Sequence, residues 1–195
     1  MITSDLYKIM LLLLLAFSTV ACKKNNRLAE AEKIVNEWLG REIKFPSDVR
    51  CCVLGKDTTA TLCSELFDRE FKVLLYVDST GCSDCRLKLF LWKQMIAESD
   101  SLFHDRLSFL FYFQPKESEI PLTFLFDSYQ FDYPVFVDMK NEIFKLNRFS
   151  QESQYQCFLL DRNDKIVSIG NPAYNEKVWD LYKSIISESK EVSQK

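Results

Sequence analysis

The stretch that decides the fold of this chain is Phe71-Lys72-Val73-Leu74-Leu75-Tyr76-Val77-Asp78-Ser79-Thr80-Gly81-Cys82-Ser83-Asp84-Cys85. Its first part, residues 71–79, is a nearly continuous run of apolar and β-branched side chains, which is typical of a strand buried in the centre of a parallel sheet. Apolar residues then recur at helical spacing, at Leu87, Phe90, Leu91 and Met95. The pattern predicts a strand, a tight turn and a helix that runs to about Glu98.

Two thiols three positions apart, Cys82 and Cys85, lie at this junction and can close into a disulfide and reopen. The start of a helix has unpaired N–H groups and the positive end of the helix dipole, and both favour an anion such as a thiolate. We therefore expect Cys82, at about the N-cap, to ionise more readily than a free thiol and to attack, while Cys85 resolves the mixed disulfide. Between them, Ser83 is followed by Asp84, whose carboxylate disfavours a thiolate and should shift the couple toward the reducing end.

The N-terminus has the pattern of an export signal. Residues 1–8 are followed by an apolar run, Ile9 to Phe17, that is too short to span a bilayer comfortably. The run ends in Ser18-Thr19-Val20-Ala21-Cys22, which resembles the lipobox of bacterial lipoproteins, and this resemblance implies that Cys22 is lipidated and becomes the first residue of the mature chain. The alternative is an ordinary cleaved signal followed by a chance cysteine.

The net charge of the chain and the residues after Cys22 bear on its expected location. The formal net charge of −3 gives no indication of nucleic-acid binding or of an electrostatic membrane patch, so the expected membrane contact is the lipid anchor itself. Residues 23–26 contain no acidic run of the kind that would argue for surface display. We expect a lipid-anchored protein of the cell envelope, on the periplasmic face of the outer membrane.

The chain contains seven cysteines, and assigning Cys22 to lipid leaves six. Disulfides persist in exported proteins, so pairing of Cys63 with Cys51 or with Cys52 is open from the sequence. The interpretation that we favour for these three residues is that of small buried hydrophobic side chains.

The remaining elements follow from periodicity and turn residues. A helix from about Arg27 should end at Gly40, and one or two short strands should lie in Val49 to Leu62 around a turn at Gly55-Lys56-Asp57. The later elements expected are a strand at Leu107 to Phe113, a helix from Pro121, a strand at Tyr133 to Asp138, a helix at Asn141 to Leu146, a hairpin of Cys157 to Leu160 with Lys165 to Ile169, and a last helix opening at Pro172, with an apolar stripe of Val178, Leu181, Tyr182, Ile185 and Ile186.

From about Phe45 onward the chain resembles the thioredoxin-fold thiol-disulfide oxidoreductases of the TlpA type, as found in Bacteroidetes lipoproteins. The motifs that carry the resemblance are Cys82 with Cys85, Tyr133-Pro134-Val135-Phe136-Val137-Asp138, and Phe158-Leu159-Leu160-Asp161-Arg162-Asn163-Asp164-Lys165. The resemblance implies an α/β fold with a central mixed sheet and helices on both faces. The expected organisation is a signal peptide at 1–21, the lipidated cysteine, a spacer and a helix at 22–44, a thioredoxin-like domain at 45–189, and a polar tail at 190–195.

Several positions depart from that family. Gly81 stands where the family usually has Trp, and Tyr155 stands where it has a cis-proline, so we expect a trans peptide there and altered docking of substrate peptides. Tyr76 replaces the buried acid, for which Asp78 is a substitute or, in the interpretation that we favour, only a solvated carboxylate. Cys157 would lie near Cys82, either as a third redox-active thiol or, as we favour, as a packed strand residue.

The expected function is disulfide exchange with envelope protein thiols through Cys82 and Cys85, with no diffusible cofactor. The family resemblance implies a membrane electron donor and client proteins. A zinc site is not favoured, because no second Cys-x-x-Cys pair exists and His104, the only histidine, lies in a helix-to-strand connection. A peroxidase would require a nearby Pro-x-x-x-Thr/Ser pattern. The alternative is a non-enzymatic thioredoxin-fold lipoprotein, with a structural disulfide, that acts as a binding or envelope module.

Overall fold

The computed structural model describes residues 29–53, 56–57, 60–78, 87–116 and 120–192. The chain forms two compact units, residues 1–39 and 40–195. In the first unit, residues 29–38 are helical. Gly40 follows with a φ of 78°, the left-handed conformation in which glycine commonly ends a helix, so the predicted end of this helix is confirmed.

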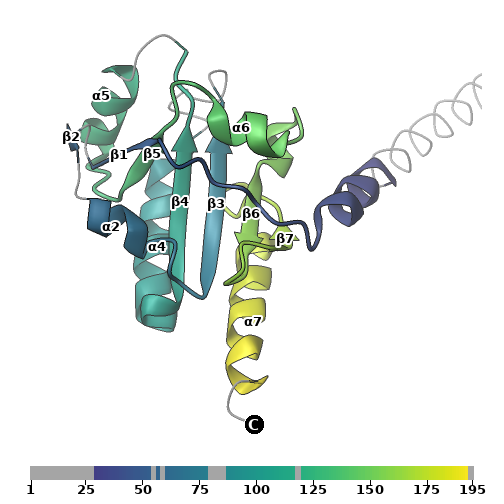
Figure 1. Cartoon of the computed structure of the whole chain (residues 1–195). Coiled ribbons are helices and arrows are strands. Elements are labelled where there is room, and N and C mark those ends of the chain that lie inside the picture. Colours follow the sequence, from purple (N-terminus) through teal and green to yellow (C-terminus); the bar gives the residue numbers. More distant parts are fainter. Residues whose placement is uncertain (1–28, 54–55, 58–59, 79–86, 117–119, 193–195) are drawn as a thin grey trace, which may run out of the picture. The chain divides into compact units, whose positions relative to one another are not determined.

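The second unit is built on a mixed sheet (Figure 1). The described strands are β1 (Arg50–Val53), β2 (Lys56–Asp57), β3 (Phe71–Val77), β4 (Leu107–Phe113), β5 (Val135–Val137), β6 (Cys157–Leu160) and β7 (Ile166–Ile169), in the order β2-β1-β5-β4-β3-β6-β7. β3, β4 and β5 are parallel, and β1 and β6 flank them in antiparallel orientation. The described helices are α2 (Ala60–Glu65), α4 (Leu89–Phe103), α5 (Ile120–Tyr129), α6 (Glu142–Asn147) and α7 (Glu176–Val192), with short 3-10 helices η1 (His104–Arg106) and η2 (Ser153–Tyr155). No described helix combines the length and apolar character needed to cross a membrane.

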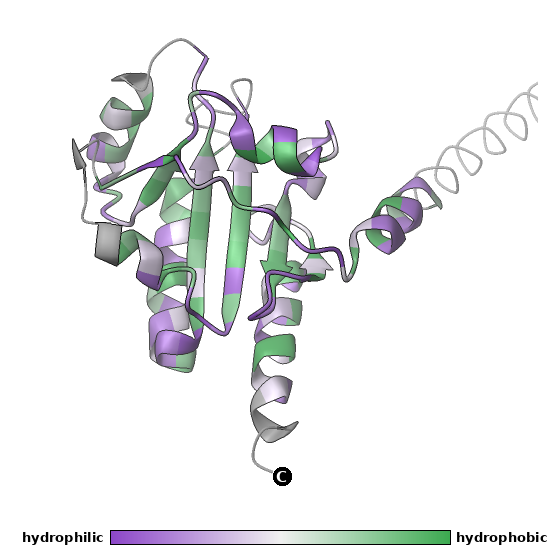
Figure 2. Ribbon diagram, viewed as in Figure 1, coloured by the Kyte–Doolittle hydropathy of each residue, from purple (hydrophilic) through white to green (hydrophobic). Residues whose placement is uncertain are grey.

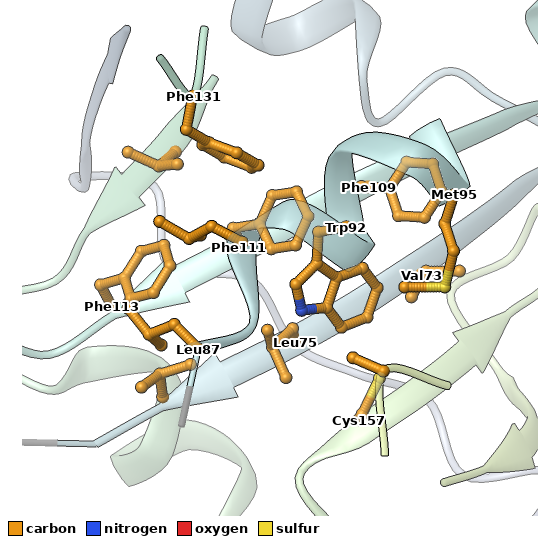
Figure 3. Close-up of a cluster of buried hydrophobic side chains, with 14 of the residues drawn as sticks. Val73, Leu75, Leu87, Trp92, Met95, Phe109, Phe111, Phe113, Phe131 and Cys157 are labelled. Carbon is orange, nitrogen blue, oxygen red and sulfur yellow. The ribbon is translucent and has the colours of Figure 1, made fainter. Parts of the chain in front are cut away.

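One face of the sheet carries the larger core. Every residue of β3 and β4 is buried, and both strands are largely hydrophobic (Figure 2). Alternate residues of the two strands point into this core, where Trp92 of α4 packs edge-on against Phe109 and Phe111 (Figure 3). Trp179 of α7 joins the same cluster through Phe109. The core on this face therefore packs α4 and α7 against the sheet.

The opposite face has a thinner cover. The ring of Tyr76 in β3 lies 5.7 Å from the ring of Phe144 and 5.3 Å from the ring of Phe149, measured between centroids. Helix α6 and Phe149 therefore cover this end of the sheet. Further along the sheet an aromatic cluster of Phe45, Phe67, Tyr112 and Phe136 covers the other end. An extended segment and two short helices, α2 and α6, thus replace long helices on this face.

The predicted fold class is confirmed, and β4 has the predicted bounds. Several details were wrong. Lys56-Asp57 form β2 instead of a turn, and α2 begins at Ala60, inside the region Val49 to Leu62 where short strands were expected. The last helix begins at Glu176, four residues after Pro172, and Leu181 of its expected stripe is 49% exposed, whereas Trp179 is buried.

A further correction concerns α4. Phe90 is 61% exposed and Leu91 is 37% exposed, although both belonged to the predicted apolar stripe. Lys88, which has a φ of 48°, separates Leu87 from the start of α4 at Leu89, so the predicted stripe did not lie on one continuous helix. Within α4 the buried residues are Leu89, Trp92, Met95, Ser99 and Phe103, and Trp92 takes the core-facing place expected for Phe90 and Leu91.

Candidate active site

A cavity of about 120 Å³ lies at the carboxyl end of β3. Parallel sheets place binding sites at this end of their strands, because loops from several elements converge there. Here the end of β3 meets the loop before β6 and the connection from β7 to α7. The described lining residues are Leu75, Tyr76, Val77, Asp78, Leu87, Gln151, Ser153, Gln156, Asn171 and Tyr174.

Asp78 and Leu87 are the two described residues on either side of residues 79–86, and both line this cavity. Cys82, Ser83, Asp84 and Cys85 lie outside the described residues, as does the predicted helix start at Cys82. The segment that contains both cysteines is therefore joined at each end to a residue that lines the cavity. Cys22 also lies outside the described residues.

Lys88 follows the cavity residue Leu87 and contacts the connection from β7 to α7. Its Nζ donates to the carbonyl of Ala173 at 3.1 Å and lies 4.4 Å from the centre of the Tyr174 ring. A cation over an aromatic face is attracted by the ring's quadrupole. Lys88 thus joins the start of α4 to the β7–α7 connection beside the cavity.

A main-chain bond holds the loop before β6 against β3, and a side-chain bond closes the loop on itself. The N–H of Tyr76 donates to the carbonyl of Gln156 at 3.0 Å, and Gln156 Nε2 donates to the carbonyl of Ser150 at 2.8 Å. Gln156 is buried, whereas Tyr155 is half-buried and lines an adjoining cavity of about 590 Å³ with Gly170 and other residues. No described peptide bond is cis, so the trans peptide expected at Tyr155 is confirmed.

Cys157 lies beneath the site, as the register partner of Leu75 in the neighbouring strand. Its side chain is fully buried, and burial raises the pKa of its thiol well above the ordinary value, although a hydrogen bond with the Tyr182 hydroxyl acts in the opposite direction. The Tyr182 hydroxyl also donates to the carbonyl of Gly170 at 2.8 Å. A protonated, enclosed thiol is a packed strand residue, which is the interpretation that the sequence favoured.

The acid position of the resembling family holds no carboxylate here. The Tyr76 side chain is buried on the thinner face, and its hydroxyl donates to Asn141 Oδ1 at 2.9 Å. Asp78 is half-buried and is the one acidic residue among the described residues that line the cavity. His104 is exposed in η1, as expected. Within the described ranges, no three histidine, cysteine or acidic side chains come together as a metal site would require.

A disulfide joins Cys51 to Cys63, so the prediction that both are buried hydrophobic thiols was wrong. Cys52 is buried, with 1% exposure, as predicted. The physical reason is the pleat of β1, which turns Cys51 and Cys52 to opposite faces of the sheet. Only Cys51 faces the side on which α2 lies with Cys63.

Sequence reasoning missed Gln156, Asn171 and Tyr174 as residues that line the site, and Lys88 as a residue that contacts the connection beside it. They come from loops and from the start of α4, and their approach depends on the folded sheet. The one sequence signal was the amide-rich run of residues 150–156, which contains three glutamines in seven positions.

No protein-family model matches this chain. No curated protein is similar to it either. Solved structures are similar in fold. One is assigned as a thiol:disulfide interchange protein DsbE from Chlorobium tepidum, with a TM-score of 0.54, 14% identity, and coverage of 76% of this chain and 96% of that chain. The thioredoxin domain of a thiol-disulfide oxidoreductase from Bacteroides vulgatus has a TM-score of 0.52, 11% identity, and coverage of 74% and 97%.

A third similar structure, assigned as a disulfide isomerase from Bacteroides thetaiotaomicron, has a TM-score of 0.51, 21% identity, and coverage of 75% of this chain and 91% of that chain. These likenesses establish a thioredoxin-like fold for this chain. The resemblance predicted from the sequence is confirmed at the level of the fold, and the structural neighbours are thiol-disulfide oxidoreductases.

Proposed function

We propose that this chain, with its thioredoxin-like fold, is a thiol-disulfide oxidoreductase that exchanges disulfides with protein thiols of the cell envelope. Cys82 attacks and Cys85 resolves. The observation that carries the proposal is that Asp78 and Leu87, which flank the segment with both cysteines, line one cavity at the carboxyl end of β3. Residues 79–86, which contain both cysteines, connect these two cavity residues directly in the chain.

The exchange conserves electrons and protons. The Cys82 thiolate attacks one sulfur of a client disulfide, and the second client sulfur leaves as a thiolate that takes up a proton. The Cys85 thiolate then attacks Cys82, so that the first client sulfur is released as a thiol and a Cys82–Cys85 disulfide forms. An external dithiol or a membrane electron donor returns the two electrons, and no diffusible cofactor is needed.

Two further residues would support this chemistry. Asp84, after Ser83, disfavours the thiolate form and shifts the couple toward the reducing end. Asp78 stands at the cavity wall, where a half-buried carboxylate can exchange a proton with the resolving thiol.

The proposed location is the periplasmic face of the outer membrane, with the chain anchored by lipid on Cys22. The support is the approach of small residues, Ser18 to Ala21, directly before Cys22. Replacing Cys22 by Ala in a bacterial host should move the protein from the membrane fraction to the soluble fraction. An unchanged membrane fraction would exclude this anchor.

The catalytic roles are tested by reduction of insulin disulfides. Cys82→Ser should abolish the activity, and Cys85→Ser should accumulate a mixed disulfide with insulin. Cys52→Ala is the matched control, because it removes a buried thiol from a strand that does not line the cavity. Activity that survives in the Cys82→Ser protein would contradict the assignment. Client proteins can then be identified from the complexes that Cys85→Ser retains.

A second candidate function is a non-enzymatic binding or envelope module in which Cys82 and Cys85 form a structural disulfide. The observation that favours it is the trans peptide at Tyr155, together with the Tyr76 ring where the resembling family has an acid. The reduction potential discriminates between the two, because structural disulfides lie below about −300 mV and catalytic ones above. Rapid alkylation of Cys82 alone after mild reduction would favour the enzyme.

A further inference from the structure

The disulfide between Cys51 and Cys63 lies on the thinner face of the sheet, away from the candidate active site. It joins β1 to α2 across a sequence separation of 12. Cys51 pairs in register with Phe136 of β5, so the disulfide lies beside the aromatic cluster. Two strands, β5 and β4, separate β1 from β3, which corresponds to about 14 Å at the usual strand spacing.

The disulfide is open to attack from solvent. A cavity of about 380 Å³ is lined by both cysteines and by Pro46, Ser47 and Val49 from the preceding segment. Cys51 is half-buried, whereas Cys63 is 8% exposed. Exchange depends on access to the sulfur that is attacked, so Cys51 is the point of entry.

The disulfide is also the strongest tie between α2 and the sheet. A helix of six residues is not stable alone, and α2 ends in Glu65, whose carboxylate opposes the negative end of the helix dipole. Other contacts lie just after α2: Ser108 Oγ donates to the carbonyl of Leu66 at 2.6 Å, Lys72 Nζ donates to the carbonyl of Phe67 at 3.4 Å, and the Phe67 ring packs against Phe45 at 5.0 Å and Phe136 at 5.5 Å. These contacts are made by residues that follow the helix, whereas the disulfide ties the helix itself to β1.

We propose that Cys51–Cys63 is a second redox site, opened by an external dithiol, and that its opening releases α2 and Phe67 from the aromatic cluster. A thiolate of the dithiol attacks Cys51 Sγ, and Cys63 leaves as a thiolate that takes up a proton. The second thiol of the reductant then resolves the mixed disulfide, so that Cys51 is released as a thiol and the reductant becomes a disulfide. Two electrons pass from the reductant to the protein. The inference does not depend on the chemistry proposed for Cys82 and Cys85.

Release of α2 would change the surface of the thinner face. Tyr112 and Phe136 stack at 4.7 Å and are 1% and 4% exposed in the oxidised protein. Phe67 covers Phe136, so its departure exposes an aromatic surface that the oxidised protein hides. The disulfide thereby makes the cover of this face depend on the redox state of the surroundings.

The test uses the full chain carrying Cys82→Ser and Cys85→Ser, titrated with mixtures of reduced and oxidised dithiothreitol and then alkylated with N-ethylmaleimide. Peptide masses report labelling at each cysteine, and hydrogen–deuterium exchange reports the order of residues 60–67. We expect Cys51 and Cys63 to become labelled with one midpoint, while exchange in residues 60–67 rises about tenfold or more and exchange in β4 stays unchanged. Buried Cys52 is the internal control and should stay unlabelled.

Two results would overturn the proposal. Labelling that begins only where β4 also exchanges would mean that the disulfide opens by global unfolding and is structural. Labelling without faster exchange in residues 60–67 would refute the release of α2. If the double variant fails to fold, the native chain answers the same question, because peptide masses distinguish Cys51 and Cys63 from Cys82 and Cys85.

Discussion

Replacing Asp164 by Asn should destabilise the protein more than replacing its ion-pair partner Lys72 by Met. Lys72 lies in β3 with a side chain that is 0% exposed, and its Nζ is 2.8 Å from Asp164 Oδ1. The Asp164 side chain is 33% exposed. The lysine is therefore the charge that has lost its water, and the aspartate is the charge that compensates it.

The magnitude follows from that asymmetry. Removing one partner of a buried pair costs about 3–5 kcal/mol, because the other charge stays buried and unpaired. Lys72 keeps the carbonyls of Phe67 and Arg162 at 3.4 and 3.2 Å, so we expect the lower value, about 3 kcal/mol, for Asp164→Asn. Lys72→Met removes the buried charge and leaves Asp164 in contact with water, so its cost should stay within about 1 kcal/mol.

Urea unfolding at neutral pH measures the free energy of unfolding of both variants, with the fluorescence of the buried Trp92 and Trp179 as the signal. Asn is the matched substitution, because residue 164 has a φ of 60° and Asn tolerates that conformation. A larger loss for Lys72→Met than for Asp164→Asn would refute the reasoning. It would mean that the hydrogen bonds of the lysine outweigh the cost of its desolvation.

Three further predictions concern the crosslink, the acid limb of stability and the enclosed thiol. Replacing Cys51 and Cys63 together by Ala should lower the free energy of unfolding by about 3 kcal/mol, since a crosslink over this loop length restricts the unfolded chain; urea midpoints equal to those of the oxidised native protein would contradict this. The hydrogen bond from Arg106 holds the pKa of Glu70 below 4.5. The stability that the Glu70 carboxylate contributes is therefore present above pH 4.5 and is lost as the pH falls through the lowered pKa. Glu70→Gln should therefore reduce the loss of stability on acidification, measured as thermal midpoints across pH, and an unchanged acid limb would exclude this cause. Cys157→Ala should leave insulin reduction unchanged and cost about 1 kcal/mol of stability, and loss of activity in a folded variant would restore a redox role for this thiol.

The strands at the centre of the sheet could be predicted because burial on both faces leaves a continuous apolar run in the sequence. β4 shows this most clearly, since all its residues are buried and its bounds match the prediction. The hairpin of β6 and β7 was equally accessible, because turn residues separate two apolar runs. The local sequence of each of these elements is enough to predict it.

The short elements could not be predicted, because their stability comes from contacts distant in sequence. β2 has two residues, and α2 has six that are held by a disulfide to another element. The stripe of α4 was misjudged because residues 89–92 are all apolar, and only the folded sheet shows that Leu89 and Trp92 face it while Phe90 and Leu91 do not.

For the candidate site, the sequence identified Asp78 and the position of Tyr155, both of which line cavities at the end of the sheet. It did not identify Gln156, Asn171 or Tyr174. Each lies on a loop, and its approach to β3 depends on how the strands pair. Site residues on converging loops become visible only when the register of the sheet is known.

The pleat of β1 also governs how this protein can mature. An unfolded chain offers Cys63 two adjacent partners at almost the same distance along the sequence, so oxidation ahead of folding would yield two crosslink isomers. Once β1 has paired with β5, Cys51 alone is reachable from α2 and Cys52 is shut inside. Correct oxidation is therefore an outcome of strand pairing, and the native crosslink should form in highest yield when the oxidant acts after the sheet has formed.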